Sequence, residues 1–525
     1  MGSRASIFQQ GFALVVCVVL TPCYVLAQSP PDPDYIRQTI FPSYLDFKTE
    51  LLATVNLADP VQRAAELDAF WTTLQNAGQV PYAQDNQVAF LYRGSASSVT
   101  WPGDFNGWNP SSSSWQGTQF SGTDLWIVEK TFPTDARLDY KVTLNGSNWI
   151  LDPANPLQMW GGFGPNNELR MPDYVFPQET VRHPGVPQGN LSGNITTFSS
   201  NLGESVNYRV YTPPGYNAAE LANLPAVYVT DGHEYLADHL GSMVVTLDNL
   251  IDSGVLQPTM AVFIDPRDPV SGTNRRASQY TGNPNFASFV ADELVLQVDS
   301  AYRSLASAAG RTILGTSLGG VNSAYFGGTR SDVFENIAVQ SPSNFSSIFN
   351  LYATQALQDE VDIYVTAGTI GDGSGGSNLT GLLAANGYDF TFTQTSEGHS
   401  WGNWRALLDE ILINLVGPTP VIAADFDGTG MVDHDDLANW NAGYGATAGA
   451  VHSNGDSDSD RDVDGRDFLI WQKQLGSGVG PASSQAKSVP EPKSSVVVLT
   501  VLLCVALASL LRSATSRALS GKGSK

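Results

Sequence analysis

Cysteine is nearly absent from this chain of 525 residues, and the three that occur lie close to its ends. Cys17 and Cys23 fall in a segment with the features of a secretory signal peptide, and Cys504 falls in an apolar segment near the other end. Removal of both segments would leave no thiol, which excludes structural disulfides from the remainder. Roughly 460 residues would remain, enough to bury large cores without cross-links and to form two to four domains.

Basic residues are also scarce. The chain has 27 Lys and Arg against 51 Asp and Glu, which gives a formal charge of −24. A phosphate backbone attracts positive charge, so this balance argues against nucleic acid as a partner. Part of the excess is local, because residues 421–476 contain eleven Asp against Arg461, Arg466 and Lys473.

The N-terminal residues have the pattern of an export signal. Arg4 precedes the apolar residues 12–20, and Val25-Leu26-Ala27 offers small residues for cleavage before Gln28. This pattern predicts a signal peptide over residues 1–27 and an exported protein. A lipoprotein linked through Cys23 is the alternative, which Pro22 disfavours.

The C-terminal residues 479–525 have the pattern of a sorting tail. Val489-Pro490-Glu491-Pro492 precedes the apolar residues 496–511, and four basic residues follow. Such a segment predicts a membrane stop-transfer element with a cytoplasmic end. It resembles the bacterial PEP-CTERM signal, which implies processing by an exosortase and release at the cell surface. A permanent single-pass anchor is the alternative.

The acidic segment repeats itself at a spacing of 31 residues. Oxygen ligands at loop positions 1, 3, 5, 9 and 12, with a carbonyl at position 7, can converge on Ca²⁺. The first loop would supply Asp425, Asp427, Thr429, Asp433 and Asp436 with the carbonyl of Met431; the second would supply Asp456, Asp458, Asp460, Asp464 and Asp467 with the carbonyl of Asp462. An apolar-patterned segment follows each loop and predicts one short helix.

This pair of loops resembles type I dockerin repeats over residues 421–478. The resemblance implies structural Ca²⁺ and a cohesin-type protein partner; a calcium-stiffened spacer without a partner is the alternative. One position departs from the pattern, because Gly430 makes the sharp turn of the first loop and Arg461 stands there in the second.

A nucleophile motif lies in the middle of the chain. Gly315-Thr316-Ser317-Leu318-Gly319 fits G-x-S-x-G, with a β-prone run before it and a helix-compatible run after it. That context predicts Ser317 as a nucleophile above an α/β sheet, with acid and then histidine following in the chain. Of the three later histidines, two lie in or between the repeats, which leaves His399 as the general base.

The acid should follow the strand before His399. Residues 361–367 are β-prone, and Asp372 lies in the loop after them, so Asp372 is the candidate that orients His399. Asp359, Asp362 and Asp389 are alternatives. An oxyanion hole needs backbone N–H groups, and the N–H of Leu318 with that of Gly232 or His233 would supply them. His233 could instead contact substrate or cap a helix.

Residues 191–416 resemble the esterase D or enterochelin-esterase-like family, which includes feruloyl and acetyl-xylan esterases. The carrying residues are Leu224-Pro225-Ala226-Val227-Tyr228-Val229-Thr230-Asp231-Gly232, Asp248-Asn249-Leu250-Ile251, Gly315-Thr316-Ser317-Leu318-Gly319-Gly320, Gln340-Ser341-Pro342-Ser343 and Gly398-His399-Ser400-Trp401-Gly402-Asn403-Trp404-Arg405. The family's substrate loop usually has Arg and then Glu three residues later. Here Arg276 and Gln279 match those positions, so the substrate of the family does not transfer directly.

Residues 81–180 read as short strands with turns between them, which predicts a β-sandwich. They resemble immunoglobulin-like E-set domains related to carbohydrate-binding family 48, through residues 103–108, Asp139-Tyr140-Lys141 and residues 152–156. Four tryptophans, Trp101, Trp108, Trp126 and Trp149, could stack on sugar rings, although packing in the core or between domains is favoured for most of them. Residues 28–80 are predicted to be helical, with no chemistry assigned.

The predicted architecture is an α/β hydrolase with a doubly wound sheet (residues 181–417), between an immunoglobulin-like β-sandwich and a small α-helical calcium-loop module. The predicted activity is ester hydrolysis through an acyl-Ser317 intermediate, without a catalytic cofactor, on acyl groups attached to polysaccharide. A siderophore esterase, an acyltransferase and a surface scaffold with an inactive hydrolase fold are the alternatives.

Overall fold

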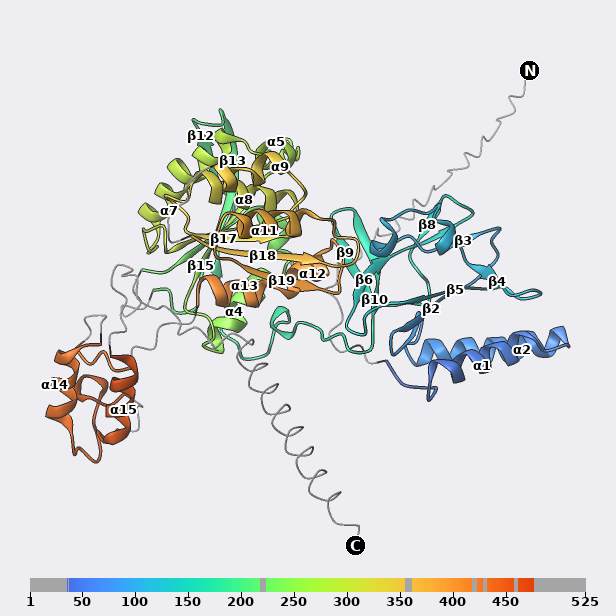
Figure 1. The fold of residues 1–525 in the computed structure, drawn as a ribbon, viewed down its shortest axis with the longest axis horizontal. Coiled ribbons are helices and arrows are strands. Elements are labelled where there is room, and N and C mark those ends of the chain that lie inside the picture. Colours follow the sequence, from blue (N-terminus) through green and yellow to red (C-terminus); the bar gives the residue numbers. More distant parts are fainter. Residues whose placement is uncertain are drawn as a thin grey trace, which may run out of the picture. The chain divides into compact units, whose positions relative to one another are not determined.

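A computed structural model describes residues 35, 37–217, 223–354, 361–417, 423–427, 432–457 and 461–475. The chain divides into two compact units, residues 1–419 and 420–525 (Figure 1). The predicted signal peptide and sorting tail lie outside the described residues, as do the predicted ligands Thr429, Met431, Asp458 and Asp460. Within the described ranges, no helix is long and apolar enough to cross a membrane.

The described part of the first unit begins with two helices, α1 (Tyr44–Val55) and α2 (Pro60–Asn76). The side chains of Ser43 and Asp59 accept hydrogen bonds from backbone N–H groups of the first turns, and Pro60 opens α2 at a position that needs no N–H donor. Both helices bury one face against a sheet, with Phe47, Leu51 and Leu74 at most 1% exposed. These helices therefore cover a β-domain and contribute to its core.

The rest of the N-terminal domain (residues 37–180) is β-structure. Its strands are β1 (Tyr82–Gln84), β2 (Gln87–Arg93), β3 (Val99–Thr100), β4 (Thr118–Gln119), β5 (Leu125–Thr131), β6 (Arg137–Tyr140), β7 (Val142–Leu144), β8 (Asn148–Ile150), β9 (Gln158–Gly161) and β10 (Gly164–Arg170). They form three small sheets, in the orders β1-β2-β5-β4, β3-β7-β8 and β6-β10-β9. Short helical turns η1 (Asp104–Asn106), η2 (Ser113–Trp115) and η3 (Gln178–Thr180) lie in its connections.

Strand β2 explains why the domain holds together. Its residues alternate between two apolar clusters, because successive side chains of a strand point to opposite faces. Phe90 faces the cluster that contains Trp101 and Tyr140, whereas Leu91 faces the cluster formed with α1 and α2. Of the four tryptophans considered above, Trp101 and Trp126 are buried in this core.

The hydrolase domain (residues 181–417) is built on one nine-stranded sheet. Its strands are β11 (Asn190–Leu191), β12 (Ile195–Ser199), β13 (Glu204–Thr212), β14 (Ala226–Val229), β15 (Met260–Asp265), β16 (Arg311–Thr316), β17 (Asn336–Gln340), β18 (Asp362–Gly368) and β19 (Thr391–Thr395). The order is β11-β13-β15-β14-β16-β17-β18-β19, with β12 also paired to β13. Strands β14 to β19 are parallel and β11 to β13 are antiparallel additions at one edge.

Helices cover both faces of this sheet (Figure 1). They are α3 (Gly232–Tyr235), α4 (Met243–Asp252), α5 (Arg276–Tyr280), α6 (Pro284–Ser288), η4 (Phe289–Leu294), α7 (Val295–Ala301), α8 (Leu318–Thr329), α9 (Ser346–Phe349), α10 (Leu351–Thr354), α11 (Gly375–Ala385), α12 (Trp401–Ala406) and α13 (Leu408–Leu415). One apolar cluster lies under α5 to α11 and the other under α3, α4, α12 and α13. The prediction of an α/β-hydrolase sheet with helices on both sides is confirmed.

The C-terminal unit (described residues 423–475) contains α14 (His434–Gly443), η5 (His452–Asn454) and α15 (Gly465–Gln474). The two repeats pack against each other reciprocally. The indole N–H of Trp440 donates to the carbonyl of Asp464 at 3.0 Å, and that of Trp471 donates to the carbonyl of Asp433 at 2.9 Å. Each repeat therefore anchors its helix on the loop of the other.

Candidate active site

Ser317 occupies a sharp turn between β16 and α8. Its φ of 58° lies in the left-handed region that non-glycine residues rarely adopt. The neighbouring glycines are needed for space: a Cβ at Gly319 would lie 2.7 Å from Thr230 Oγ1, and one at Gly320 would lie 2.7 Å from the carbonyl oxygen of Gln340. The backbone N–H of Ser317 donates to that same carbonyl at 2.9 Å, which holds the turn at the end of the sheet.

His399 and Asp372 lie on loops that follow β19 and β18, the third and second strands beyond β16 in the sheet. His399 lies between β19 and α12, and Asp372 lies in the loop after β18. Nδ1 of His399 is 2.5 Å from Asp372 Oδ1, and Nε2 is 2.9 Å from Ser317 Oγ. With the proton on Nδ1, Nε2 is free to accept the hydroxyl proton of Ser317.

Asp372 is buried, whereas His399 is partly exposed to solvent. The side chain of Asp372 is 1% exposed, and its Oδ2 accepts a hydrogen bond from the backbone N–H of Gly368 at 2.6 Å. The His399 side chain is 34% exposed, and the ring of Trp404 stands against it edge to face at 4.9 Å. A buried carboxylate behind an accessible imidazole can orient the ring and stabilise its charged form.

The alternative acids lie elsewhere. Asp362 begins β18, at the opposite end of that strand from Asp372, and Asp389 is exposed before β19. Asp359 lies outside the described residues.

The predicted oxyanion residues lie at the starts of two helices. Leu318 opens α8, and Gly232 and His233 open α3, where first-turn N–H groups have no partner within the helix. The side chain of His233 faces a separate cavity of about 250 Å³, where its Nδ1 lies 3.6 Å from Asp265. Burial lowers the pKa of His233 to about 4, so this ring is neutral near pH 7.

Of the predicted substrate-binding residues Arg276 and Gln279, the first lines the cavity around Ser317 and the second does not. Arg276 lines the same cavity as Ser317, where its Nε donates to buried Asp231 at 2.8 Å and its Nη2 donates to the carbonyl of Thr316 at 2.9 Å. Burial raises the pKa of Asp231 to about 6, partly offset by Arg276. Gln279 is 2% exposed and donates to Glu204 at 3.0 Å instead of lining that cavity.

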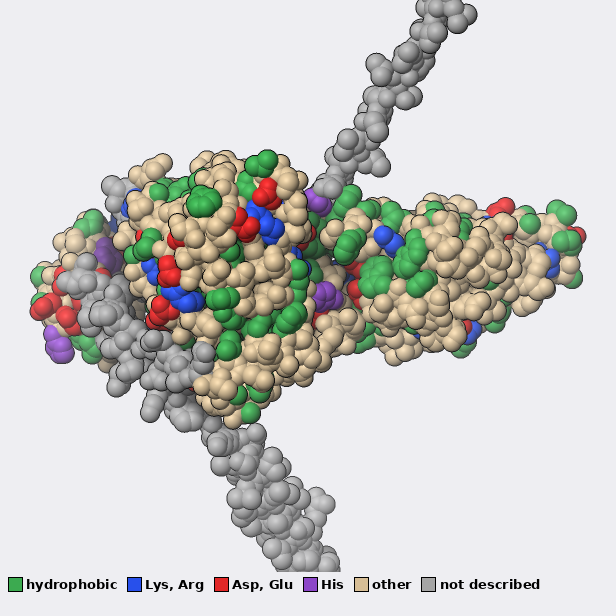
Figure 2. Space-filling view, turned by 90° about the horizontal axis from the view of Figure 1, so that it is seen from above, with side chains coloured by type: hydrophobic (Ala, Val, Ile, Leu, Met, Phe, Trp, Pro, Cys, Tyr) green, Lys and Arg blue, Asp and Glu red, His purple; other side chains and the backbone are tan. Residues whose placement is uncertain are grey.

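A cavity of about 610 Å³ surrounds Ser317 and His399. The N-terminal domain supplies one of its walls, with Trp108, Trp149 and Phe163, and α12 supplies Trp401 and Trp404. Figure 2 shows hydrophobic side chains gathered along the boundary between the two domains, with histidine and acidic side chains in the hollow between them. Phe163 is fully exposed and Trp149 is 42% exposed, so both rings are available to a ligand.

Sequence reasoning missed the polar residues that the N-terminal domain brings to this cavity. Asp104, Asp139 and Lys141 line it, and they belong to the segments that carry the E-set resemblance. The family resemblance implies that an equivalent domain helps to shape the substrate site, but no motif marked these individual residues as neighbours of Ser317.

Two acidic groups in the C-terminal unit could hold a metal. Ligand oxygens of Asp425, Asp427 and Asp436 lie within 4.8 Å of one another, and those of Asp462, Asp464 and Asp467 do the same. Asp433 and Asp464 also cap the N-termini of α14 and α15. One carboxylate oxygen of Asp456 accepts a hydrogen bond from the backbone N–H of Arg461 at 3.0 Å. Its other oxygen is buried and has no hydrogen-bond partner among the described residues.

Comparison with known proteins agrees with this geometry. Residues 199–415 match the family model described as a putative esterase. This domain is a carboxylic ester hydrolase. A curated relative of the hydrolase, the uncharacterized protein YjcH of Bacillus subtilis (strain 168), is 25% identical over 231 residues, which cover 41% of this chain and 93% of that protein.

Solved structures resemble more than the hydrolase domain. The enterobactin esterase of Shigella flexneri, crystallised in the presence of enterobactin, has a TM-score of 0.54 at 21% identity and covers 66% of this chain and 97% of its own. The ferric enterobactin esterase of Salmonella typhimurium has a TM-score of 0.54 at 20% identity, with coverages of 66% and 98%. The esterase-like α/β-hydrolase fold is therefore shown.

Proposed function

We propose that this protein is an exported serine esterase that cleaves carboxylic esters through an acyl-Ser317 intermediate. The observation that carries the proposal is the continuous hydrogen-bonded chain from Ser317 through His399 to Asp372. His399 takes the serine proton as Ser317 Oγ attacks the ester carbonyl, and it returns that proton to the leaving alcohol. In the second step, water attacks the acyl-enzyme carbonyl while His399 takes its proton, and His399 then returns that proton to Ser317 Oγ as the acid is released.

The negative charge of each tetrahedral intermediate needs donors at the developing oxyanion. The backbone N–H of Leu318, next to the nucleophile, is assigned as one donor, and that of Gly232 or His233 as the other. Because both lie in first helical turns, the positive ends of α8 and α3 add to the stabilisation.

The proposed substrates are acyl groups attached to polysaccharide, such as feruloyl or acetyl esters. The cavity supports a substrate larger than a simple alkyl ester, because exposed Phe163 and Trp149 extend it beyond Ser317. Aromatic faces can receive either an aryl acyl group or the apolar side of a sugar ring.

A siderophore-type ester is the second candidate. The enterobactin esterases resemble this chain over about two thirds of its length, which is more than the hydrolase domain alone. The N-terminal domain of this chain also walls the cavity around Ser317.

A panel of methyl ferulate, acetylated xylan and a catechol siderophore triester separates these substrates. Wild-type protein is compared with Ser317→Ala, and with Ser323→Ala as a matched hydroxyl deletion on the same helix. Release from either plant-type ester that depends on Ser317 but not on Ser323 supports the first proposal, and release from the triester alone supports the second. Transfer of the acyl group to an added sugar instead of water would identify an acyltransferase. No hydrolysis and no reaction of Ser317 with a fluorophosphonate would contradict esterase activity.

The proposal for the C-terminal unit is structural Ca²⁺ in two loops, with a cohesin-type protein as its partner. The Ca²⁺ part of the proposal is supported by the two groups of converging carboxylates and by buried Asp456, one oxygen of which has no hydrogen-bond partner among the described residues. Hard oxygen ligands of this kind suit Ca²⁺. Export through the signal peptide and surface release by an exosortase complete the proposal; mass spectrometry of the secreted protein would test both predicted cleavages.

A further inference from the structure

The N-terminal domain enters the space between the two loops that carry His399 and Asp372. Turn η1 lies there, and glycines on both loops make room for it. A Cβ at Gly398, directly before His399, would overlap the carboxyl group of Asp104, and a Cβ at Gly371, directly before Asp372, would overlap the Asp104 carbonyl. The shape of both loops is therefore matched to one residue of the other domain.

Asp104 is held rigidly in that position. It is 3% exposed, one carboxylate oxygen accepts from the backbone N–H of Asp139 at 2.8 Å, and the other accepts from the indole of Trp108 at 3.2 Å. These bonds fix η1 against β6, the strand that begins at Arg137.

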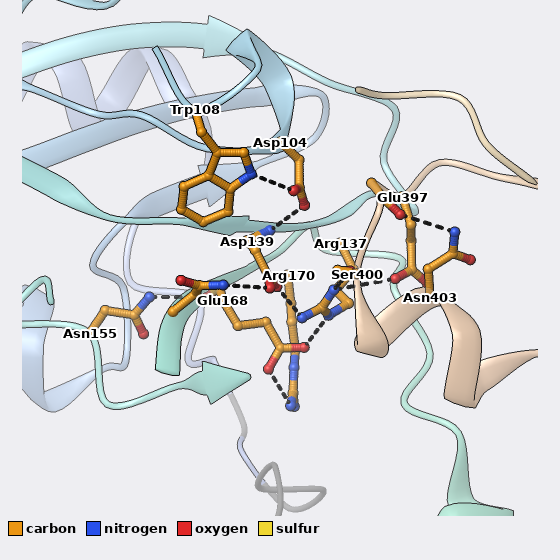
Figure 3. A network of polar contacts seen from close by, with 12 residues as sticks. Asp104, Trp108, Arg137, Asp139, Asn155, Glu168, Arg170, Glu397, Ser400 and Asn403 are labelled. Carbon is orange, nitrogen blue, oxygen red and sulfur yellow. Dashed lines mark hydrogen bonds and ion pairs between the residues drawn. The ribbon is translucent and has the colours of Figure 1, made fainter. Parts of the chain in front are cut away.

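Arg137 ties the same strand to the histidine loop (Figure 3). Its side chain is wholly buried, with Nε 2.6 Å from Glu168 and Nη2 in contact with Asp139, both in the N-terminal domain. Nη1 points the other way, donates to Ser400 Oγ at 2.9 Å and lies 3.5 Å from Glu397. One guanidinium thus spans the two domains and contacts residues on both sides of His399.

The backbone of the histidine loop also pairs with the N-terminal domain. Arg137 forms a parallel bridge with Glu397, and a Cβ at Gly402 in α12 would overlap the Arg137 guanidinium. Gly398 and Gly402, four residues apart around His399, thus both leave space for side chains of the N-terminal domain.

We infer that Arg137 is a positioning residue for the esterase: it holds the loop 397–400 so that His399 meets Ser317, which makes the N-terminal domain part of the catalytic centre. The inference rests on the proposed role of His399. A displacement of about 1 Å in a reacting group can lower a rate about 100-fold. Lysine cannot replace this arginine, because its single ammonium lacks the planar fork that contacts Glu168, Asp139 and Ser400 together.

The test measures kcat and KM for 4-nitrophenyl acetate in Arg137→Lys and Ser400→Ala. Ser400→Ala removes the contact with Arg137 without removing a helix cap, because the Ser400 hydroxyl makes no capping hydrogen bond to α12. Tyr140→Phe is the matched control: it removes a buried hydroxyl that donates to Asp152 at 2.9 Å and accepts from Asn155 at 3.0 Å, both within the N-terminal domain.

We expect kcat to fall between about 10- and 100-fold in Arg137→Lys and at least about threefold in Ser400→Ala, with KM within about twofold of wild type. Tyr140→Phe should lower the thermal midpoint while leaving kcat unchanged. Because a smaller folded fraction would also lower the apparent kcat without changing KM, kcat is calculated per folded protein, with the folded fraction measured by circular dichroism.

A kcat within twofold of wild type in folded Arg137→Lys overturns the inference. If that variant does not fold, the same criterion is applied to Ser400→Ala. Failure of the proposed function has a different signature, because wild-type Ser317 would then neither turn over ester nor react with a fluorophosphonate, and the inference would fall with it.

Discussion

Ser317 shows how one residue stores local strain for chemistry. A positive φ at a residue with a side chain costs about 1–3 kcal/mol, and it persists only when the surroundings enforce it. Here the enforcing contacts are the backbone bond to Gln340 and the close approach of Gly319 to Thr230. A Cβ at Gly315 or Gly319 would come within 2.7 Å of Thr230 Oγ1, which explains these two glycines of the motif.

Asp372→Asn should reduce kcat by about 10³- to 10⁴-fold with little change in KM. The asparagine amide can present N–H to Nδ1 of His399, which would place the imidazole proton on Nε2 and leave no acceptor for the Ser317 hydroxyl. Asp362→Asn, at the exposed start of the same strand, is the control and should keep wild-type kcat. A comparable loss in both variants would argue against an orienting role for Asp372.

Glu397→Gln should make stability less dependent on pH. Burial raises the pKa of Glu397 to about 7, partly offset by Arg137 and reinforced by Glu168 and Asp139. A carboxyl whose pKa is raised on folding stabilises the fold below its ordinary pKa near 4.5, and this contribution is lost as the pH rises through about 7.

The difference between the thermal midpoints of Glu397→Gln and wild type should therefore shift in favour of the variant between pH 5 and pH 8.5. The corresponding change in unfolding free energy is about 1–3 kcal/mol. Glu50→Gln, at an exposed position of α1, is the control for the loss of one carboxyl group. A pH-independent difference for Glu397→Gln would contradict the raised pKa.

Among the elements, the hairpin β9–β10 has an arrangement suited to substrate contact. Its strands pair Gly161 with Gly164, so Gly162 and Phe163 form the tip, and Phe163 is fully exposed beside the catalytic cavity. A phenyl ring that is exposed in the free protein gains burial only when a ligand covers it.

Phe163→Ala should raise KM about fivefold for methyl ferulate or another bulky ester, which corresponds to about 1 kcal/mol of lost burial. Its kcat should stay near the wild-type value, and 4-nitrophenyl acetate should be unaffected. Phe198→Ala removes a ring that is 65% exposed on β12 and lies away from the cavity, so it should change neither constant. Equal KM values for the bulky ester in Phe163→Ala and wild type would exclude this contact.

The second loop of the C-terminal unit has a strained backbone conformation at Arg461, which a glycine would relieve. Arg461 has a φ of 71°, a conformation that costs a non-glycine residue about 1–2 kcal/mol. Arg461→Gly should raise the thermal midpoint of this unit by about 4–8 °C. Arg466→Gly, the same exchange within α15, should lower it, because glycine weakens a helix. A lower midpoint for Arg461→Gly would show that the arginine side chain stabilises the loop.

The elements differ in how far the sequence predicts them. The Ser317 turn follows from a motif with a strand before it and a helix after it, and the places of His399 and Asp372 follow from chain order and from the ends of parallel strands. Arg137 could not be found in this way, because its partner Glu397 lies 260 residues away and each looks like an ordinary charged residue. Packing was favoured for most of the four tryptophans, but Trp108 and Trp149 line the cavity around Ser317, a position that depends on how the two domains meet.

At the scale of the whole molecule, catalysis and metal binding are assigned to separate units. Ser317, His399, Asp372 and the wall from the N-terminal domain all lie within residues 1–419, whereas the converging aspartates lie within residues 420–525. Among the described residues of the C-terminal unit, the buried apolar cluster is small and includes Phe426, Val432 and Trp471. A core of that size needs another source of stability, which bound Ca²⁺ would supply.

Chelation should therefore unfold the C-terminal unit and spare the esterase. Without a cation, the clustered carboxylates repel one another. EDTA should therefore abolish the thermal unfolding transition of the C-terminal unit and the near-UV signal of Trp440 and Trp471. The kcat for 4-nitrophenyl acetate should not change, because serine chemistry needs no metal. Asp436→Asn and Asp467→Asn should each weaken the rescue by added Ca²⁺. Loss of esterase activity in EDTA would show that the two units are coupled, and an unchanged C-terminal transition would remove the calcium proposal.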